Sequence, residues 1–431
     1  MIHSNCSDNG RKGIRVLYAV SLFSGLSASV QKRVWEPAGA PTIYRMIEAL
    51  DAGPDQLNLV FCPRTRESSG GIQAPTRTAI SGLKTPVWVL PYYTSSVLKR
   101  LGLERVYREL RQALFLAGLC RRKKVDLCYF NNGNLLIAAL FAYLGVGRVV
   151  LRVMGAYPVM KEIAARRKTP AAWIEYKAYR APYAHVVCTQ DGSGGEWFMD
   201  RALRPEVPRT LMLNGVDTAF KERADQGIAK KRVGVPSERP LILFVGKMEP
   251  AKGCMEFLDA VATLAKERPD AFTAVMIGKG PQLHSAEERA KSDGLERYVR
   301  VIPSVPHRSI VEWHHAADIY VSMNLLGGLS NANLEAMRSG TCVVMLEGDR
   351  ERHVDETTDH MLTEGCVVRI GRKRAVENLK EALKELLDNP EKRRGIGEKM
   401  ARVAKELIPT WDERIQSELQ LLQRVAAGER V

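Results

Sequence analysis

The chain has 431 residues, of which 45% are hydrophobic and 26% are charged, a composition that is typical of globular proteins and excludes a largely disordered one. A single hydrophobic core stops growing well below this length, so we expect two domains of roughly 200 residues each. The net charge is +15, and residues 1–217 hold 30 basic and 16 acidic residues, an imbalance that favours anionic partners for the first half of the chain.

In the first half, short β-branched runs alternate with longer amphipathic stretches. This alternation predicts a parallel sheet with helices on both faces. The predicted helices are Pro41–Leu50, 104–124 and 134–145. The predicted strands are Ile14–Val20, Gln56–Cys62, Pro86–Pro91, Val125–Phe130, Arg148–Gly155, His185–Gln190 and Thr210–Asp217. We therefore expect residues 1–220 to form a Rossmann-like, acceptor-binding domain.

The second half repeats the pattern after a polar stretch, residues 221–240, whose lack of periodicity indicates a linker. Helices are predicted at 253–269, 309–317 and 331–338, and strands at Pro240–Gly246, 271–277, Tyr298–Pro303, Asp318–Met323 and Thr341–Leu346. Residues 221–408 are thus expected to form a second Rossmann-like domain. The last segment, 409–431, has the spacing of an amphipathic helix, and we expect it to dock back toward the N-terminal domain.

Glycine turns follow two of the predicted strands of the second half. In "GKMEPAKG", Gly246 permits a sharp turn and two cations, Lys247 and Lys252, project from the end of the strand. In "GKGP", Gly278 and Gly280 form a similar turn. Ligands of doubly wound sheets bind at the carboxyl ends of the strands, and two cations suit a diphosphate.

The stretch "GGLSNANLEAM" begins with Gly327 and Gly328 and places Ser330 as the N-cap of a helix that starts at Asn331. Free backbone N–H groups at the helix start and the helix dipole would then face an anionic ligand. The candidate donor-binding residues of this loop are Gly327, Gly328, Leu329, Ser330 and Asn331. Glu335 lies further along the helix, where a carboxylate can accept hydrogen bonds from ribose hydroxyls.

These motifs, "FVGKMEPAKG", "MIGKGPQ", "EWHHAADIYVSMN", "GGLSNANLEAMRSG" and the earlier "LNGVD" with Asn214, resemble the retaining family 4 glycosyltransferases. The resemblance covers the second half almost completely. In the first half it rests on the strand and helix rhythm, on the helix that follows Gly39, and on "VVLRVMGAYP". It implies the GT-B fold, in which two doubly wound Rossmann-like domains face each other across a cleft.

The resemblance also implies roles for particular residues. The basic pair that holds the donor diphosphate falls on Lys247 and Lys252, and the second glutamate of the family's E-x7-E motif falls on Glu335, the ribose-binding position. The first glutamate of that motif falls on Gly327, and a histidine common in the first domain would align near Met154, so both groups are absent. A donor sugar that differs from the common hexoses, such as a uronic acid, would be consistent with these departures, and Asn324 or Asn331 would supply contacts to it.

The function predicted from these features is transfer of a glycosyl group from a nucleotide diphosphate sugar, as co-substrate, to a hydroxyl of a glycan or lipid-linked acceptor, as in polysaccharide biosynthesis. Such a hexosyltransferase-like enzyme needs no other cofactor, and the sequence lacks a DxD-like pair that would demand a metal ion. The alternative is a non-catalytic GT-B subunit that binds a sugar nucleotide, which the absence of the two family residues favours. A sugar-nucleotide epimerase would need histidines in the cleft, whereas His314 and His315 are expected on a helix surface.

The basic clusters at 120–124 and 165–168 favour an anionic membrane surface as a partner, and the lack of interleaved aromatic residues argues against nucleic acid. The longest apolar runs are too short to span a bilayer, and the first residues do not follow a signal-peptide pattern. We therefore expect a cytoplasmic protein, peripheral at the inner face of the membrane. The eight scattered cysteines, from Cys6 to Cys366, indicate buried thiols and no disulfide framework.

Overall fold

In the computed structural model, residues 13–165, 170–220, 225–362 and 364–431 are described; Cys6 and most of the 165–168 cluster lie outside them. The chain divides into two compact units. The first comprises the residues up to Thr189, Glu196–Met212 and Ile415–Val431, and the second comprises Gln190–Gly195 and Leu213–Arg414. The second unit thus begins before the expected boundary at residue 221, and it takes a short segment, 190–195, out of the first.

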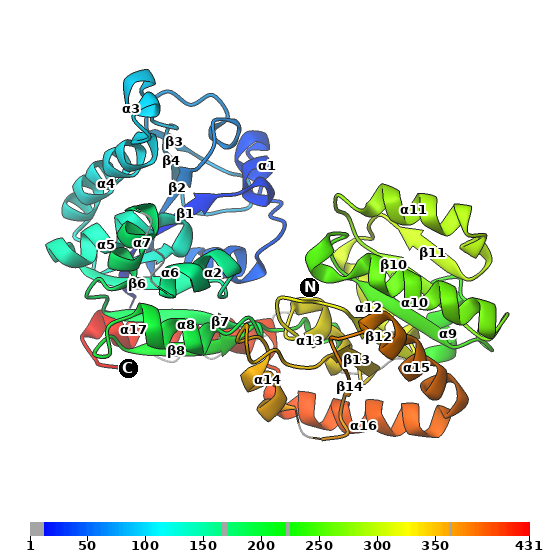
Figure 1. The fold of residues 1–431 in the computed structure, drawn as a ribbon. Helices are drawn as coiled ribbons and strands as arrows, with labels where there is room; N and C mark the ends of the chain where they lie inside the picture. Colours follow the sequence, from blue (N-terminus) through cyan, green and yellow to red (C-terminus); the bar gives the residue numbers. More distant parts are fainter. Residues whose placement is uncertain (1–12, 166–169, 221–224, 363) are drawn as a thin grey trace. The chain divides into compact units, whose positions relative to one another are not determined.

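Among the described residues, the first unit is built on an eight-stranded sheet, in the order β3-β4-β2-β1-β5-β6-β7-β8 (Figure 1). From β4 to β7 in this order the paired strands run parallel, and β3 is antiparallel to β4. The strands are β1 (Arg15–Leu22), β2 (Gln56–Pro63), β3 (Thr76–Thr78), β4 (Val87–Val89), β5 (Leu127–Asn131), β6 (Arg148–Val153), β7 (His185–Gln190) and β8 (Arg209–Leu213).

Helices cover both faces of this sheet. One face packs against α4, α5, α6, α7 and α8, and the other against α1, α2 and the C-terminal helix α17. Alternate residues of β1 point to opposite faces, since Leu17 and Ala19 belong to the first core and Val16, Tyr18 and Val20 to the second. The helices are α1 (Ser24–Lys32), α2 (Pro41–Ala52), α3 (Ser96–Arg100), α4 (Glu104–Lys123), α5 (Leu135–Leu144), α6 (Pro158–Ala164), α7 (Pro170–Tyr179), α8 (Gly195–Ala202) and α17 (Trp411–Ala427).

The second unit has a six-stranded sheet within the described residues, with the order β11-β10-β9-β12-β13-β14 and parallel pairing. Because β9 lies between β10 and β12, the strand order reverses beside it, which is the kind of position where doubly wound sheets bind ligands. The strands are β9 (Leu241–Val245), β10 (Thr273–Ile277), β11 (Val299–Ile302), β12 (Ile319–Ser322), β13 (Cys342–Leu346) and β14 (Val368–Ile370).

The second sheet is also covered on both faces, by α10, α11 and α15 on one and by α9, α12, α13 and α16 on the other. Its helices are α9 (Gln226–Arg232), α10 (Cys254–Glu267), α11 (Leu283–Ser292), α12 (His307–Ala316), α13 (Asn331–Arg338), α14 (Glu356–Met361), α15 (Ala375–Asp388) and α16 (Pro390–Leu407). The expected fold class, two doubly wound α/β domains, is confirmed. The expected linker, however, contains α9, because Ala229 and Val233 pack into the core of the second unit.

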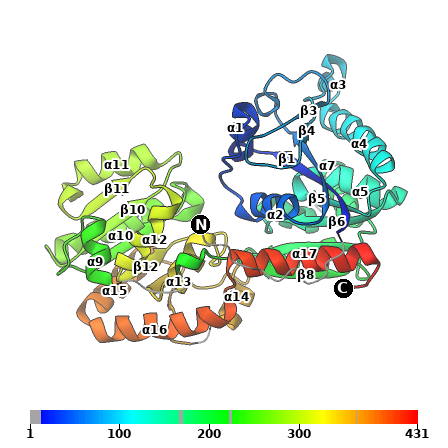
Figure 2. The same ribbon diagram turned by 180° about the vertical axis from the view of Figure 1, so that it is seen from behind.

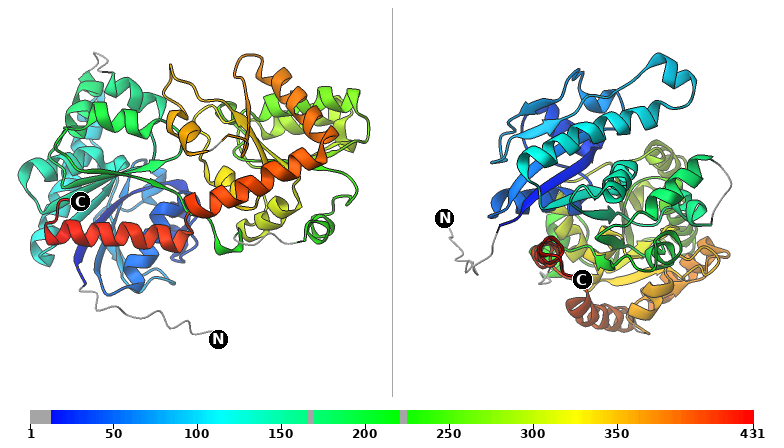
Figure 3. Two further views of the ribbon diagram at one scale, coloured as in Figure 1. Left: turned by 90° about the horizontal axis from the view of Figure 1, so that it is seen from below. Right: turned by 90° about the vertical axis from the view of Figure 1, so that its left-hand side faces the viewer.

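The C-terminal helix returns to the first unit. In Figure 3, α16 (orange) ends before α17 (red) begins, and the residues of α17 from Ile415 onward pack with β5, β6 and β7. Figure 2 shows α17 along β8. At the buried side of this helix, Glu418 forms an ion pair with Arg152 of β6 at 3.2 Å and accepts a hydrogen bond from Tyr129 of β5.

Candidate functional site

The turn after β9 holds the two predicted diphosphate ligands. Lys247 is exposed, whereas Lys252 is half-buried at the end of a short 3-10 turn, Pro250–Lys252. Burial lowers the pKa of the Lys252 ammonium, while the nearby Glu249 and Asp191 carboxylates act in the opposite direction. A cation held in a partly desolvated place interacts more strongly with an anionic ligand than one in water does.

Gly278 and Gly280 allow the turn after β10 to pack against the turn after β9. A Cβ atom at Gly278 would lie 1.7 Å from the Gly246 carbonyl oxygen, and one at Gly280 would lie 2.3 Å from that of Met248. The two turns also share backbone hydrogen bonds, such as the one that the Met248 N–H donates to the Lys279 carbonyl at 2.9 Å. These glycines therefore hold two turns together, and their contact with a phosphate remains a prediction.

The loop before α13 is already hydrogen-bonded within the chain. The Gly328 N–H donates to Asp355 Oδ1 at 2.7 Å, and the Leu329 N–H donates to the Asp191 carbonyl at 3.1 Å. Ser330 is the N-cap residue of α13, as predicted, but its side chain makes no capping hydrogen bond. The Gly328 and Leu329 amides thus have partners within the chain, and contact between this loop and a donor remains a prediction.

The place of the missing motif glutamate is filled by another segment of the second unit. Gly327 has φ +145°, and a Cβ atom there would lie 2.4 Å from the Asp191 carbonyl oxygen and 2.8 Å from the Ser193 nitrogen. The facing Gly192 is equally confined, with φ +83° and a Cβ position 2.1 Å from Asp355 Oδ1. A side chain at Gly327 would thus collide with backbone. This packing accounts for a glycine at residue 327 without reference to the donor sugar.

Two carboxyl groups that the sequence analysis did not select lie at this loop. Asp355 is buried and accepts hydrogen bonds from the Gly328 N–H and, at 2.9 Å, from the Thr358 hydroxyl. Asp191 accepts a hydrogen bond from the Ser193 N–H at 3.0 Å. Burial raises the pKa of both carboxyl groups. The sequence signal for Asp191 was the glycine-rich "QDGSGG" after a predicted strand, a motif that does not include Asp355.

Glu335 lies on α13 and is 6% exposed, between two histidines of α12. Its carboxylate oxygens are 3.6 Å from His314 Nε2 and 3.9 Å from His307 Nε2, and His307 also approaches Asp217 at 2.9 Å. His314 and His315 are buried, so the expectation that they lie on a helix surface is wrong.

Gly39, Met154 and Asn214, which the resemblance singled out as residues of an acceptor site or a first-domain loop, lie in different elements. Gly39 is exposed in the connection between α1 and α2, and Met154 is half-buried after β6. Asn214 belongs to the second unit, where its side-chain amide donates to Asn331 Oδ1 at 2.7 Å. Asn324, the other expected sugar contact, is buried and donates to the Gly327 carbonyl. The two asparagines expected to contact the sugar, Asn324 and Asn331, thus each have a partner within the chain.

No group of three or more His, Cys, Asp or Glu side chains in the described part of the chain is arranged to hold a metal ion. Nor does any helix within the described ranges have the length and apolar character needed to cross a membrane.

Comparison with known proteins identifies the second unit. Residues 225–403 match the family of glycosyl transferases group 1. The match covers less than half of the chain and lies within the second unit. The matched region contains the predicted donor-site residues from Gly246 to Glu335, and it excludes the Asp191–Ser193 turn that packs on Gly327.

Relatives and solved structures extend this result to the fold. A D-inositol 3-phosphate glycosyltransferase of Corynebacterium kroppenstedtii is 28% identical over 198 residues, 44% of this chain and 42% of the relative, so the alignment spans less than half the length of that enzyme. Sucrose-phosphate synthase from Thermosynechococcus elongatus has a TM-score of 0.67 at 16% identity, over 96% of this chain and 100% of that one. HepE of Anabaena, solved in complex with UDP, has a TM-score of 0.66 at 14% identity, over 95% and 100%. The chain therefore has the GT-B fold of these glycosyltransferases.

Proposed function

We propose that the protein transfers a glycosyl group from a nucleotide diphosphate sugar to a hydroxyl group of an acceptor, with retention of the anomeric configuration. The match of residues 225–403 to the glycosyl transferases group 1 supports this proposal, as does the likeness to HepE, whose structure holds UDP. The observation that carries it is Lys252, a half-buried cation at the carboxyl end of β9.

In the proposed reaction, negative charge develops on the diphosphate as its bond to the sugar breaks. Preorganised positive groups stabilise that charge in the transition state more than in the ground state. Lys252 would bind the leaving diphosphate together with Lys247, and the positive end of the α13 dipole at Ser330 would assist them. Glu335 would accept hydrogen bonds from the ribose hydroxyls, held in place between His307 and His314.

A second candidate is a non-catalytic protein that binds a sugar nucleotide. The specific observation in its favour is that the Gly328 and Leu329 amides and the space beside Gly327 are used within the chain. Nucleotide binding without turnover would support this candidate. The acceptor is proposed to be a glycan or a lipid-linked precursor, in keeping with the positive charge of residues 1–217.

The main test is the Lys252→Ala variant, assayed for hydrolysis of nucleotide sugars with neutral and acidic sugars. Loss of a preorganised charge of this kind costs about 3 kcal/mol in the transition state, or roughly a hundredfold in kcat. Lys291→Ala is the matched control, since Lys291 is an exposed lysine of α11 in the same unit. Unchanged turnover in Lys252→Ala would remove the diphosphate assignment.

Calorimetric titration with UDP and other nucleoside diphosphates separates the two candidates. An enzyme is expected to bind a nucleotide and to hydrolyse at least one donor of the panel. Binding without turnover of any donor, with and without candidate acceptors, would favour the non-catalytic protein. Glu335→Ala is expected to weaken binding of the nucleotide whatever sugar it carries.

A further inference from the structure

Helices α3 and α4 of the first unit present large aliphatic side chains to solvent. Six of them are between 44% and 65% exposed: Val97, Leu101, Leu103, Val106, Leu110 and Leu114. The last four follow each other at spacings of three and four residues, so they form one stripe along α4. We call these six residues the α3–α4 surface; Figure 1 shows the two helices in cyan.

The first half of α4 has its polarity reversed relative to an ordinary surface helix. Arg108, Glu109 and Gln112 are buried, at 8%, 7% and 2% exposed, while Leu110 and Leu114 face solvent at 49% and 63%. A helix of a globular protein normally turns its apolar stripe to the core and its polar face to water. Exposed apolar patches of this kind mark sites of contact with another protein or with a membrane.

The charges around the surface are almost all positive. Residues 95–124 hold nine basic and two acidic residues. Both acids have partners within the chain, since Glu109 pairs with Arg105 at 2.9 Å and Glu104 accepts a hydrogen bond from Thr94. The basic residues that stay exposed include Arg111 beside the stripe and the run 121–124 at the end of α4.

We propose that the α3–α4 surface seats the first unit on a lipid bilayer that contains anionic lipids. Aliphatic side chains flanked by lysine and arginine are the composition by which a helix lies in the interface plane, with its apolar face among the acyl chains and its cations at the headgroups. A second copy of this chain would bring two patches of like charge together, which opposes such a dimer. A single-stranded nucleic acid would need stacking aromatic residues, whereas the stripe is aliphatic.

This docking surface goes beyond the proposed reaction and does not depend on it. The uneven charge of the sequence predicted an anionic surface as a partner of the whole first half, and the exposed stripe assigns that contact to two helices. Contact through the α3–α4 surface requires both acyl chains and negative headgroups. Membrane binding is therefore expected to depend on the apolar residues, on the charge of the lipids and on salt.

The test is co-sedimentation of the full chain with vesicles of phosphatidylcholine alone and of phosphatidylcholine mixed with phosphatidylglycerol. The wild type is expected to bind the anionic vesicles and to be released as salt rises. Leu110→Gln with Leu114→Gln is expected to lower the partition coefficient by about tenfold or more. Substitution of Arg121, Arg122 and Lys123 by glutamine is expected to lower the partition coefficient by roughly fivefold per charge removed.

Matched controls come from the second unit. Ile228→Gln removes an aliphatic residue that is 53% exposed, and Arg402→Gln with Lys405→Gln removes two exposed cations of α16. Both controls are expected to bind vesicles as the wild type does. Circular dichroism checks that each variant is folded. Nucleotide titration without vesicles measures binding at the proposed donor site independently of the membrane.

Three results would overturn the proposal. Absence of wild-type binding to anionic vesicles at low salt is the first. Equal binding by the Leu110→Gln, Leu114→Gln variant is the second. The third is a concentration-dependent dimer, measured by light scattering, that the double variant abolishes while vesicle binding stays unchanged, because the occupant of the surface would then be a second copy of the chain.

Discussion

At the scale of single residues, the packing around Gly327 leaves no room for the first glutamate of the E-x7-E motif in the glycosyltransferases that the sequence resembles. The segment 191–193 occupies the space that a side chain at residue 327 would need, and Asp355 binds the following amide. The carboxylates near this loop thus come from other elements and are used as hydrogen-bond acceptors of the backbone. A glutamate restored at residue 327 would meet backbone before it met a donor sugar.

We predict that Gly327→Ala lowers the free energy of unfolding by more than about 2 kcal/mol, because a positive φ costs roughly 1–2 kcal/mol and the new Cβ also collides with the Asp191 carbonyl. Gly294→Ala is the matched control in the same unit, with φ +65° and nothing within 4 Å of its Cβ position. The Gly294→Ala variant has the cost of a positive φ but no collision of its Cβ atom. Urea unfolding measures both, and equal losses would show that the 191–193 segment yields to a side chain.

His185 of β7 gives a second prediction at this scale. It is fully buried beside Thr210, and burial lowers its pKa from 6.5 to about 4. The unfolded chain therefore binds more protons between these values, so stability is present above pH 6.5 and is lost as the pH falls toward 4.

The expected loss from His185 between pH 7.5 and pH 5 is about 2 kcal/mol. His185→Gln should flatten this part of the urea-unfolding profile. His284→Gln, which removes a histidine that is 80% exposed in its side chain, should leave the profile unchanged. A wild-type slope retained in His185→Gln would assign the acid sensitivity to other groups.

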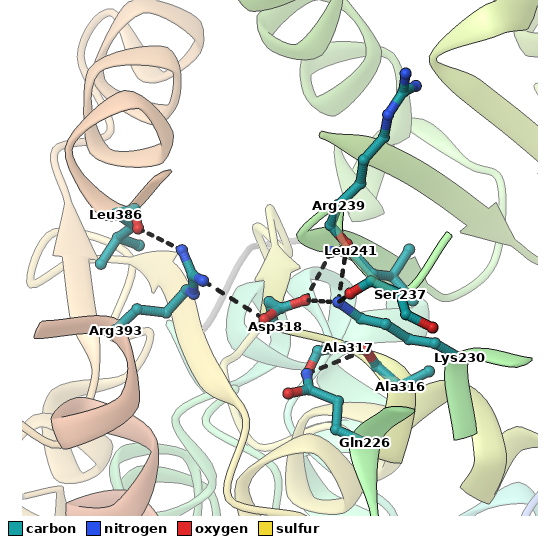
Figure 4. A network of polar contacts seen from close by, with 10 residues as sticks. All are labelled: Gln226, Lys230, Ser237, Arg239, Leu241, Ala316, Ala317, Asp318, Leu386 and Arg393. Atoms are coloured by element: carbon teal, nitrogen blue, oxygen red, sulfur yellow. Dashed lines mark hydrogen bonds and ion pairs between the residues drawn. The ribbon is translucent and has the colours of Figure 1, made fainter. Parts of the chain in front are cut away.

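At the scale of elements, a buried ionic network joins α9 to the start of β12 and to α16 (Figure 4). Asp318 accepts from Lys230 at 2.8 Å, lies 3.5 Å from Arg393, and also accepts from the Leu241 N–H at 2.8 Å. Lys230 and Arg393 are 5% and 9% exposed. The network explains why the stretch expected as a linker is packed: Lys230 is buried and pairs with Asp318, the residue that precedes β12.

We predict that Asp318→Ala lowers the free energy of unfolding by about 3–5 kcal/mol, because it leaves two buried cations without their carboxylate. Glu312→Ala is the control: it breaks the pair between Glu312 and Arg232, which joins α12 to α9 but is 41% and 61% exposed. Its cost is expected to stay below about 1 kcal/mol. Urea unfolding that gave the two variants similar losses would contradict a structural role for the network.

At the scale of the whole molecule, strand and helix periodicity sufficed to predict two doubly wound domains, because each long element has an apolar face of its own. The short elements β14 and α9 were missed, since their partners are distant in sequence, and the helices α15 and α16 were not predicted either. The same limit applies to the site: strand ends indicated Lys252 and Glu335, but the contacts of Gly327 with residues 191–193 and 355 arise only from folding. Burial of His314 also depends on such contacts, with Phe220 and Tyr320.

Another long-range contact ties the end of the chain to its beginning. Helix α17 starts within the second unit and continues into the first, where Glu418 pairs with Arg152 across 266 residues of sequence. The side chains of Arg152 and Glu418 are 1% and 0% exposed, and Arg152 also donates to the Thr189 hydroxyl at 2.9 Å. Removal of the Glu418 charge would therefore leave the buried Arg152 guanidinium without this carboxylate.

We predict that Glu418→Ala lowers the free energy of unfolding of the first unit by about 3–5 kcal/mol, because it strands the Arg152 guanidinium in the core. Glu418→Gln keeps an oxygen acceptor for Arg152 and should cost less. Gln416→Ala, on the exposed side of α17, is the control and is expected to stay within about 0.5 kcal/mol of the wild type.

Hydrogen exchange measured by peptide localises the effect: β5 and β6 should lose protection in Glu418→Ala, while β9 and β12 keep theirs. Equal loss of protection in both sheets would mean that the two units unfold together and that the ion pair supports the whole chain, whereas wild-type protection of β5 and β6 would mean that α17 holds its place by apolar packing alone.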